Sequence, residues 1–262
     1  MRGFEILDSG QVLYIEEYGV GPPLLCVHGL GGGAYFFSGL ADALKSRCRI
    51  IAVDLPGAGF SPRGAPFCFE RCADMLVELA AKRLGGPFTF VAHSLGTILA
   101  LKVSARVPDG VRKIISVGGL GEPLPLVKIR LRDRADLVEK NGMPGIGDTA
   151  IPVTVSEKTM REMPDRVFLL RRLLELNNAE CYIEMARALA QASAMEEATK
   201  LRAPFLAITG SEDRYAPPSV VDEFLRTLVC PTRQIVLDGV GHMPFFEAPD
   251  EFYRAVLECV EA

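Results

Sequence analysis

The chain has 262 residues, of which 49% are apolar and 24% charged, a balance typical of a folded globular protein and not of a disordered or fibrous one. Its 29 Lys and Arg against 33 Asp and Glu give a net charge of −4, which offers no basic excess for nucleic-acid binding. No unbroken apolar run exceeds four residues, so we expect no membrane-spanning segment. The length predicts a single domain with room for an insertion.

Cysteine usage indicates free thiols rather than a disulfide framework. The seven cysteines are an odd number scattered along the chain, and a protein of this size does not need cross-links to fold. Glu5 and Asp8 lie where a secretory signal would be apolar, so we expect a cytoplasmic protein. Cys68 and Cys72 are four residues apart, but no further Cys or His lies near them in the sequence, and we expect no metal site.

The N-terminal segment and six later apolar runs predict the strands of one sheet. Residues 4–17 are expected to form two strands around a turn at Asp8-Ser9-Gly10. The later runs are continuous rather than alternating, as in parallel strands covered on both faces. The runs occupy residues 24–27, 50–53, 88–92, 114–117, 205–209 and 234–237, and helix-like stretches lie near residues 35–45, 70–84, 95–107, 218–228 and 247–260. This alternation predicts an α/β fold with a mostly parallel, doubly wound sheet.

Residues 122–200 interrupt this alternation, because they contain helical patterns and no strand-like run. Helix breakers at Asn141-Gly142, Pro144-Gly145 and Pro164 divide the segment. We therefore expect a core of residues 1–121 and 201–262 and a helical insertion at residues 122–200. Counted from residue 121, the insertion holds 12 Lys and Arg against 13 Asp and Glu, so its overall charge says nothing about the substrate.

Ser94 is the candidate nucleophile, because reactive groups of an α/β sheet lie in loops at the carboxyl ends of strands. It follows a predicted strand within Ala92-His93-Ser94-Leu95-Gly96 and precedes a helix-like stretch. This strand–turn–helix pattern resembles the nucleophile elbow G-x-S-x-G, with Ala92 in place of the first glycine. Small residues are needed on both sides because the turn is tight and the neighbouring backbone approaches closely.

A glycine-rich loop, His28-Gly29-Leu30-Gly31-Gly32-Gly33, follows the run at residues 24–27. It lacks the Lys-Ser/Thr of a P-loop and the full spacing of a dinucleotide fingerprint. We expect the backbone N–H of Leu30 to form an oxyanion hole together with that of Leu95, which follows the nucleophile. His28 is expected to hold the loop by a hydrogen bond rather than to take part in catalysis.

Two further strand ends carry a candidate acid and a candidate base. Asp213 follows the run at residues 205–209, and His242 follows the last run in a glycine-containing loop. The chain order Ser94, Asp213, His242 is the order of the catalytic triad in α/β hydrolases. Glu122, which follows the run at residues 114–117, is the alternative acid. Asp54 also follows a strand, but its Asp-Leu-Pro-Gly-Ala-Gly segment is more simply a rigid turn.

Taken together, these motifs resemble those of the α/β-hydrolase superfamily over the whole chain. The matching segments are His28-Gly29-Leu30-Gly31, Asp54-Leu-Pro-Gly-Ala-Gly-Phe-Ser61, Ala92-His-Ser-Leu-Gly96, Gly210-Ser-Glu-Asp213 and Gly241-His242. The resemblance implies that the insertion at residues 122–200 is the family's helical cap. Within the superfamily, the chain is similar to small esterases and 3-oxoadipate enol-lactonases, a narrower match that rests partly on Gly142-Met-Pro-Gly-Ile-Gly-Asp-Thr149.

The resemblance implies a serine hydrolase that acts on a small carboxylic ester or lactone and needs no metal or organic cofactor. Ser94 would attack the acyl carbon, His242 would transfer the protons, and Asp213 would orient the imidazole. Loops near the predicted site supply six candidate pocket residues: Phe36, Phe37, His93, Met143, Met243 and Phe245. For His93, packing beneath the elbow is the preferred interpretation.

Other functions use the same three residues and stay open. A C–C bond hydrolase or a cofactor-free perhydrolase would employ the same triad, and some small-molecule receptors keep this fold and triad with slow turnover. The only partner that we expect is a small-molecule ester or lactone, without nucleic acid or membrane. The protein is expected to be a monomer or a homodimer.

Overall fold

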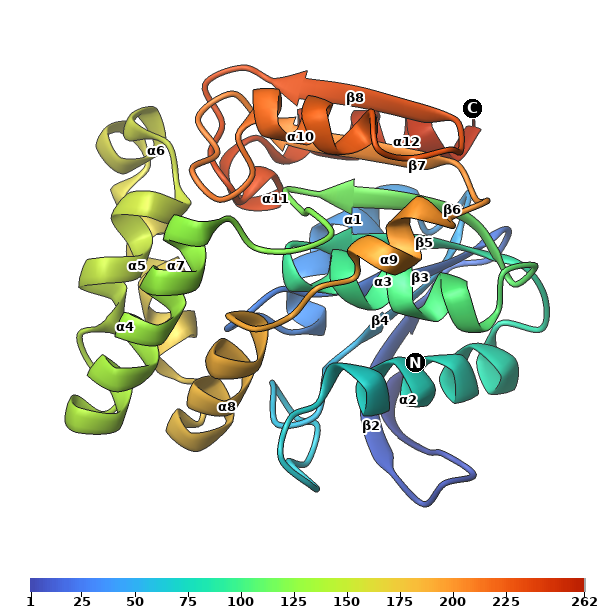
Figure 1. Ribbon diagram of the computed structural model, residues 1–262, viewed down its shortest axis with the longest axis horizontal. Coiled ribbons are helices and arrows are strands. Elements are labelled where there is room, and N and C mark those ends of the chain that lie inside the picture. The colour runs from blue at the N-terminus through green and yellow to red at the C-terminus, as the bar shows by residue number, and fades with distance from the viewer. Residues whose placement is uncertain (262) are drawn as a thin grey trace.

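The computed structural model describes residues 1–261, in which eight strands form one sheet in the order β1-β2-β4-β3-β5-β6-β7-β8 (Figure 1). The first strands are antiparallel: β1 (Arg2–Ile6) pairs with β2 (Val12–Tyr18), and β2 pairs with β4 (Arg49–Val53). The other pairs are parallel and join β3 (Pro23–Val27), β4, β5 (Phe88–His93), β6 (Val111–Val117), β7 (Phe205–Gly210) and β8 (Thr232–Leu237). This is the mostly parallel, doubly wound sheet that the sequence predicts.

The strand order brings the predicted site loops together at one edge of the sheet. The chain passes from β3 to β4 on one side and then returns to β5 on the other side of β3, so the loops after β3 and β5 diverge at a topological switch point. In the register, Val27 at the end of β3 lies opposite Ala92 in β5. Because β5 to β8 are neighbours in chain order, the segments that follow them lie side by side at the same carboxyl edge.

Both faces of the sheet are covered, which explains why its central strands β3 and β5 are buried at nearly every position. Side chains at alternate positions belong to two separate hydrophobic clusters; in β3, Leu25 and Val27 face one and Leu24 and Cys26 the other. One face packs against α2 (Phe69–Arg83), α3 (Leu95–Arg106) and α10 (Pro218–Leu225), and the opposite face packs against α1 (Ser38–Leu44) and α12 (Pro249–Glu261).

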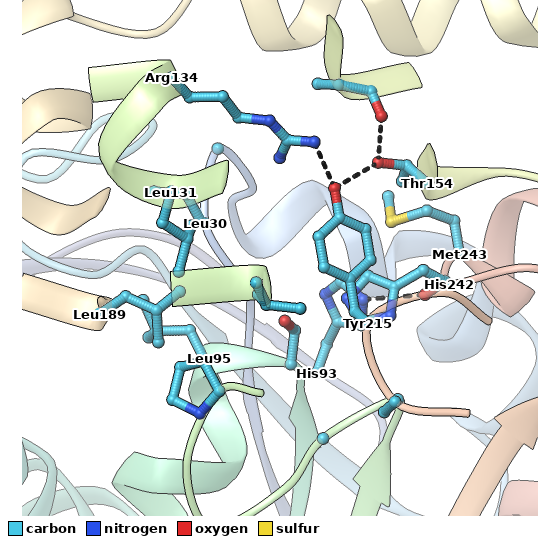
Figure 2. A pocket seen from close by; sticks show the side chains of 18 of the residues that line it. Leu30, His93, Leu95, Leu131, Arg134, Thr154, Leu189, Tyr215, His242 and Met243 are labelled. Atoms are coloured by element: carbon cyan, nitrogen blue, oxygen red, sulfur yellow. Dashed lines mark hydrogen bonds between the residues drawn. The ribbon is translucent and has the colours of Figure 1, made fainter. Parts of the chain in front are cut away.

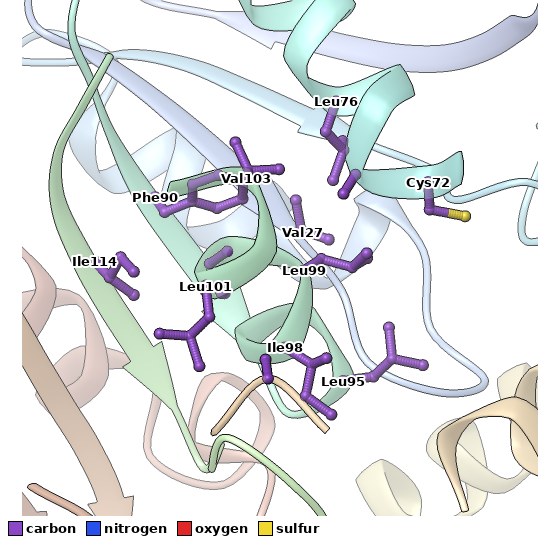
Figure 3. Close-up of a cluster of buried hydrophobic side chains, with 14 of the residues drawn as sticks. Val27, Cys72, Leu76, Phe90, Leu95, Ile98, Leu99, Leu101, Val103 and Ile114 are labelled. Carbon is purple, nitrogen blue, oxygen red and sulfur yellow. The ribbon is translucent and has the colours of Figure 1, made fainter. Parts of the chain in front are cut away.

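Helix α3 is central to the first cluster. Figure 3 shows its side chains from Leu95 to Val103 packed among residues of α2, β3, β5 and β6. Every residue from 95 to 104 is buried, so this part of the helix has no exposed face. Burial of one large aliphatic side chain contributes about 1.5–3 kcal/mol, and this packing fixes the N-terminus of α3 beneath the candidate nucleophile.

A run of helices separates β6 from β7, as expected for residues 122–200. These are α4 (Pro125–Asn141), α5 (Ile146–Thr154), α6 (Glu157–Glu162), α7 (Pro164–Glu175), α8 (Ala179–Leu189) and α9 (Met195–Thr199). In Figure 1, α4 to α8 lie beyond the arrowheads of β6 and β8, whereas α9 packs against α3. Gly142, with φ of 74°, follows the end of α4, and Pro164 begins α7, so both breakers mark helix boundaries.

The boundaries differ from the predicted ones mainly at short helices. The stretch at residues 35–45 is divided into the 3-10 helix η1 (Ala34–Phe37) and α1, and the last predicted helix is preceded by the short α11 (Pro244–Glu247). Prolines at positions 244 and 249 each begin a helix, which explains the break between α11 and α12. Across residues 1–261, no helix combines the length and apolar character that crossing a membrane requires.

Candidate active site

Ser94 occupies a strained, sharp turn between β5 and α3. Its φ of 51° makes it the only non-glycine residue with positive φ in the described part of the chain. Its N–H donates to the carbonyl oxygen of Val117 at 2.9 Å, which ties the turn to β6. A Cβ at Gly96 would lie 2.5 Å from the carbonyl oxygen of Val27, so this position has no room for a side chain. Such strain costs about 1–3 kcal/mol and is a feature of functional sites.

His242 and Asp213 form a buried hydrogen-bonded pair. His242 Nδ1 lies 2.8 Å from Asp213 Oδ2, and the two residues are only 5% and 3% exposed. The other carboxylate oxygen, Oδ1, accepts from the N–H groups of Tyr215 at 2.8 Å and Ala216 at 3.0 Å. Because the carboxylate accepts, Nδ1 carries the proton in the neutral ring and Nε2 is left as the basic nitrogen.

Ser94 and His242 line one cavity of about 110 Å³ at the carboxyl edge of the sheet (Figure 2). The hydrogen bond that the described imidazole forms is the one to Asp213, and none joins it to the Ser94 hydroxyl; catalytic contacts of this kind often tighten only in the complex with the reactant. Most of the wall is apolar and comes from both the core and the inserted helices, including Leu30, Leu95, Ile98, Val127, Leu131, Ile151, Leu170, Leu174, Leu189 and Met243.

The predicted oxyanion donors lie at the same cavity. Leu30 and Leu95 both line it, and neither backbone N–H has a hydrogen-bond acceptor within residues 1–261. The Leu30 loop is held by His28, whose Nε2 accepts from the N–H of Leu55 at 3.0 Å and whose Nδ1 donates to the Gly29 carbonyl at 2.7 Å. The two N–H groups are therefore available to a bound oxyanion, and His28 has the loop-holding contacts that the sequence suggests.

The other acids considered as candidates have different partners. Glu122 reaches the cavity, but its carboxylate forms a salt bridge with Lys128 at 2.9 Å. Asp54 accepts from the backbone N–H groups of Ala34 at 2.6 Å and Phe60 at 2.8 Å, as expected of a residue that fixes turns. Of the two acids that follow β6 and β7, only Asp213 contacts the imidazole of His242.

Three of the six expected pocket residues line the cavity: Phe36, His93 and Met243. The other three residues do not line the cavity, which corrects the prediction, and they belong to hydrophobic clusters instead. Phe37 is fully buried and its ring lies beside that of Phe245, Phe245 packs between Phe36 and Phe252, and Met143 lies in a small cluster between α4 and α8. Adjacent residues of a helical turn face different directions, which a single sequence does not resolve for the pair Phe36-Phe37.

His93 packs beneath the site, in contact with His242. Its Nε2 donates to the backbone carbonyl of His242 at 3.1 Å, and the two ring centroids are 4.9 Å apart. Burial, with the neighbouring His242 as a further cause, holds the pKa of His93 well below its usual value. His93 is therefore neutral, and its hydrogen bond fixes the backbone that carries the candidate base.

Comparison with known proteins identifies the fold family of the chain. The family model described as "alpha/beta hydrolase fold" matches residues 22–249. The chain belongs to the α/β-hydrolase fold family. It is 26% identical over 248 residues to the pimeloyl-(acyl-carrier protein) methyl ester esterase of Neisseria meningitidis serogroup C, and this alignment covers 90% of the chain and 92% of that protein.

Solved structures of other α/β hydrolases superpose over nearly the whole chain. A thermophilic esterase from Thermogutta terrifontis has a TM-score of 0.90 and 25% identity, covering 100% of this chain and 98% of that one. The enol-lactonase from Burkholderia xenovorans LB400 has a TM-score of 0.90 and 20% identity, covering 99% and 100%, a likeness that shows the fold. The family and these relatives identify the chain as an esterase-like α/β hydrolase.

Glu247 is a site residue of this α/β hydrolase that the sequence analysis missed. Its buried carboxylate accepts from the N–H groups of Gly241 at 3.0 and 3.1 Å and of Met243 at 3.1 Å, the two neighbours of His242. It also accepts from the Ser156 N–H at 2.8 Å, at the start of α6. One carboxylate thus links the histidine loop to the inserted helices. In the sequence, nothing distinguishes Glu247 from an exposed acidic residue before a helix.

Gly118 is a second residue that the sequence analysis missed. It follows β6 with φ of 58°, and a Cβ at this position would lie 2.8 Å from both Asp213 Oδ2 and His242 Nδ1. A side chain here would displace one partner of the acid–base pair. The two consecutive glycines, Gly118 and Gly119, directly after a predicted strand could have indicated that other groups pack closely against the backbone there.

Tyr215 connects the acid–base pair to the inserted helices. Its ring centroid lies 4.5 Å from that of His242. Its hydroxyl accepts from Arg134 Nη2 at 2.5 Å and lies 3.4 Å from Thr154 Oγ1 (Figure 2). Arg134 and Thr154 belong to α4 and α5, so the tyrosine whose ring lies beside His242 also contacts two polar side chains of the insertion.

Proposed function

We propose that this protein is a serine hydrolase that cleaves a small carboxylic ester or lactone through Ser94, His242 and Asp213. The observation that carries the proposal is the position of the strained Ser94 turn on the same cavity as His242, whose Nδ1 is paired with Asp213. The Nε2 of His242 is then the proton acceptor for the serine hydroxyl.

In this mechanism, His242 removes the hydroxyl proton of Ser94 as the oxygen attacks the acyl carbon. The N–H groups of Leu30 and Leu95 stabilise the oxyanion that forms, each contributing about 3 kcal/mol to the lowering of the barrier. His242 next protonates the leaving alkoxide, which leaves an acyl-enzyme on Ser94. A water molecule, deprotonated by the same imidazole, releases the acid and restores the serine.

We further propose that residues 122–200 act as a cap that shapes the acyl-binding part of the cavity. Residues of α4, α5, α7 and α8 contribute to its wall. The insertion is fastened to the site loops, since the His242 N–H donates to the Thr154 carbonyl at 2.7 Å and Asn177 Nδ2 donates to the Gly31 carbonyl at 3.1 Å. A cap held in this way excludes water from the acyl group and selects its shape.

The decisive experiment replaces the nucleophile and compares it with a matched serine. Ser94→Ala is expected to abolish hydrolysis of p-nitrophenyl acetate and covalent labelling by a fluorophosphonate, while the far-ultraviolet circular dichroism spectrum is retained. Ser104→Ala is the control, because Ser104 lies in the same helix and donates only to the Ala100 carbonyl, at 2.8 Å. Labelling that persisted in Ser94→Ala would show that another residue is the nucleophile.

A further inference from the structure

Arg134 is a buried cation without an anionic partner. It lies in α4, is 7% exposed, and is the only buried arginine within residues 1–261. The structure gives its guanidinium one hydrogen bond, from Nη2 to the hydroxyl of Tyr215 at 2.5 Å. No salt bridge joins it to a described Asp or Glu, although several exposed arginines of the chain have such a partner.

Nearby groups do not neutralise this charge. Glu122 lines the same cavity but is paired with Lys128, and Asp136, on the exposed side of α4, pairs with Arg187 at 2.9 Å. Tyr182 is buried beside the guanidinium, and burial raises the pKa of its phenol to about 12 even though Arg134 opposes the rise. Phenol hydroxyls offer hydrogen bonds but no counter-charge. An arginine buried in this way is costly unless a ligand supplies the anion.

The guanidinium faces the cavity that holds Ser94 and His242 (Figure 2). Its central carbon lies 5.5 Å from the ring centroid of Tyr215, which lies 4.5 Å from the ring centroid of His242. The guanidinium carbon is therefore at most 10.0 Å, the sum of these two distances, from the imidazole centre. Arg134, Ser94 and His242 line this one cavity, so the two groups are within the span of a short bifunctional molecule.

We propose that the substrate carries a free carboxylate on its acyl part and that Arg134 binds this carboxylate while the ester carbonyl lies at Ser94. This inference rests on the proposed hydrolase function and names the substrate class. The planar guanidinium fork matches a carboxylate, and the apolar lining of the same cavity, which includes Leu30 and Leu131, suits a short hydrocarbon chain. The substrate is thus a half-ester of a short dicarboxylic acid.

Pairs of esters that differ only in this charge test the inference. Monomethyl and dimethyl esters of succinic, glutaric and adipic acid are compared by kcat/KM, because the second methyl group removes the carboxylate and keeps the chain. The unmodified protein is expected to prefer the best half-ester over its dimethyl ester by about 10- to 100-fold, the value of a charged hydrogen-bonded pair. Equal or faster hydrolysis of the dimethyl esters throughout the series would overturn the inference.

Variants then assign the preference to one side chain. Arg134→Gln is expected to reduce the ratio of the two kcat/KM values to about one, mainly through KM, because the carboxylate is held in both ground and transition states. Arg134→Lys is expected to keep part of the ratio, since it retains the charge without the fork. Arg132→Gln is the matched control, because Arg132 is exposed on the same helix, and it is expected to leave the ratio unchanged. A ratio that survives in Arg134→Gln would refute the assignment.

Binding without turnover separates this inference from the proposed function. Glutarate and succinate are titrated calorimetrically into Ser94→Ala protein, with Arg134→Gln or Arg132→Gln as a second substitution. Binding is expected in Ser94→Ala and in the Arg132 double variant, and a weakening of about 10- to 100-fold is expected with Arg134→Gln.

Carboxylate binding without any ester hydrolysis by the unmodified protein would support the anion site and refute the hydrolase. Ester hydrolysis without carboxylate binding that depends on Arg134 would support the hydrolase and refute the anion site. Should Arg134→Gln fail to fold, Arg134→Lys and the paired esters with the unmodified protein still decide the question.

Discussion

Replacing Asp213 by asparagine tests whether the carboxylate determines which nitrogen of His242 is the base. Asp213 Oδ1 accepts from the N–H groups of Tyr215 and Ala216, so the oxygen of an asparagine would take this place and its NH₂ group would face His242 Nδ1. An NH₂ donor requires Nδ1 to accept, which moves the ring proton to Nε2. The imidazole would then present a donor to Ser94 instead of a base.

The expected loss in kcat is about 10⁴-fold, or about 5.5 kcal/mol, the effect of the wrong tautomer in Ser-His-Asp triads. The assay is steady-state hydrolysis of p-nitrophenyl acetate at pH about 7.5, with circular dichroism as the check that the fold persists. Glu122→Gln is the control, because Glu122 is the other acid that follows a neighbouring strand and its carboxylate is paired with Lys128. Loss of kcat in Glu122→Gln together with full activity in Asp213→Asn would refute the reasoning.

Three further predictions concern the surroundings of His242. Glu247→Gln is expected to lower kcat and to lower the free energy of unfolding by about 1–3 kcal/mol, because an amide cannot accept from all the backbone donors around it. Urea unfolding measures the second effect, and unchanged stability would contradict the prediction. Gly118→Ala is expected to lower the free energy of unfolding by about 1–2 kcal/mol, because the residue has a positive φ. It is also expected to lower kcat by about 100-fold, because the new Cβ displaces Asp213 or His242; a variant with normal kcat would show that His242 and Asp213 do not need the room beside Gly118. The free energy of unfolding is expected to fall as the pH drops below about 6.5, and His93 contributes up to about 1.4 kcal/mol per pH unit to this fall. Burial lowers the pKa of His93 in the folded state, so in this pH range the unfolded chain binds more protons than the folded protein. Urea unfolding between pH about 5 and 8 measures this slope, which should be shallower in His93→Gln; identical slopes would rule out His93 as its source.

Much of the fold was predictable because its signals are local. Continuous apolar runs predicted β3 to β8, and for β3 to β7 the reason is burial on both faces, whereas β8 at the edge is partly exposed. The elbow around Ser94 was recognisable from five consecutive residues. Helix α4 was not predicted as a separate element, because its buried positions are interspersed with exposed charged residues. One of the buried positions, Arg134, is itself charged, so the apolar pattern of the helix is weak.

The sequence by itself determined which residue types follow each strand, and hence that a hydroxyl, a carboxylate and an imidazole gather at one edge of a parallel sheet. Only the tertiary structure decided which acid faces the imidazole, because Asp213 and Glu122 both follow strands and differ only in the partners that other segments bring to them. It also decided that one arginine among the many of a nearly neutral insertion is buried at the cavity. Such distinctions depend on the direction of side chains and on contacts between distant segments, and these are set by packing and not by local sequence.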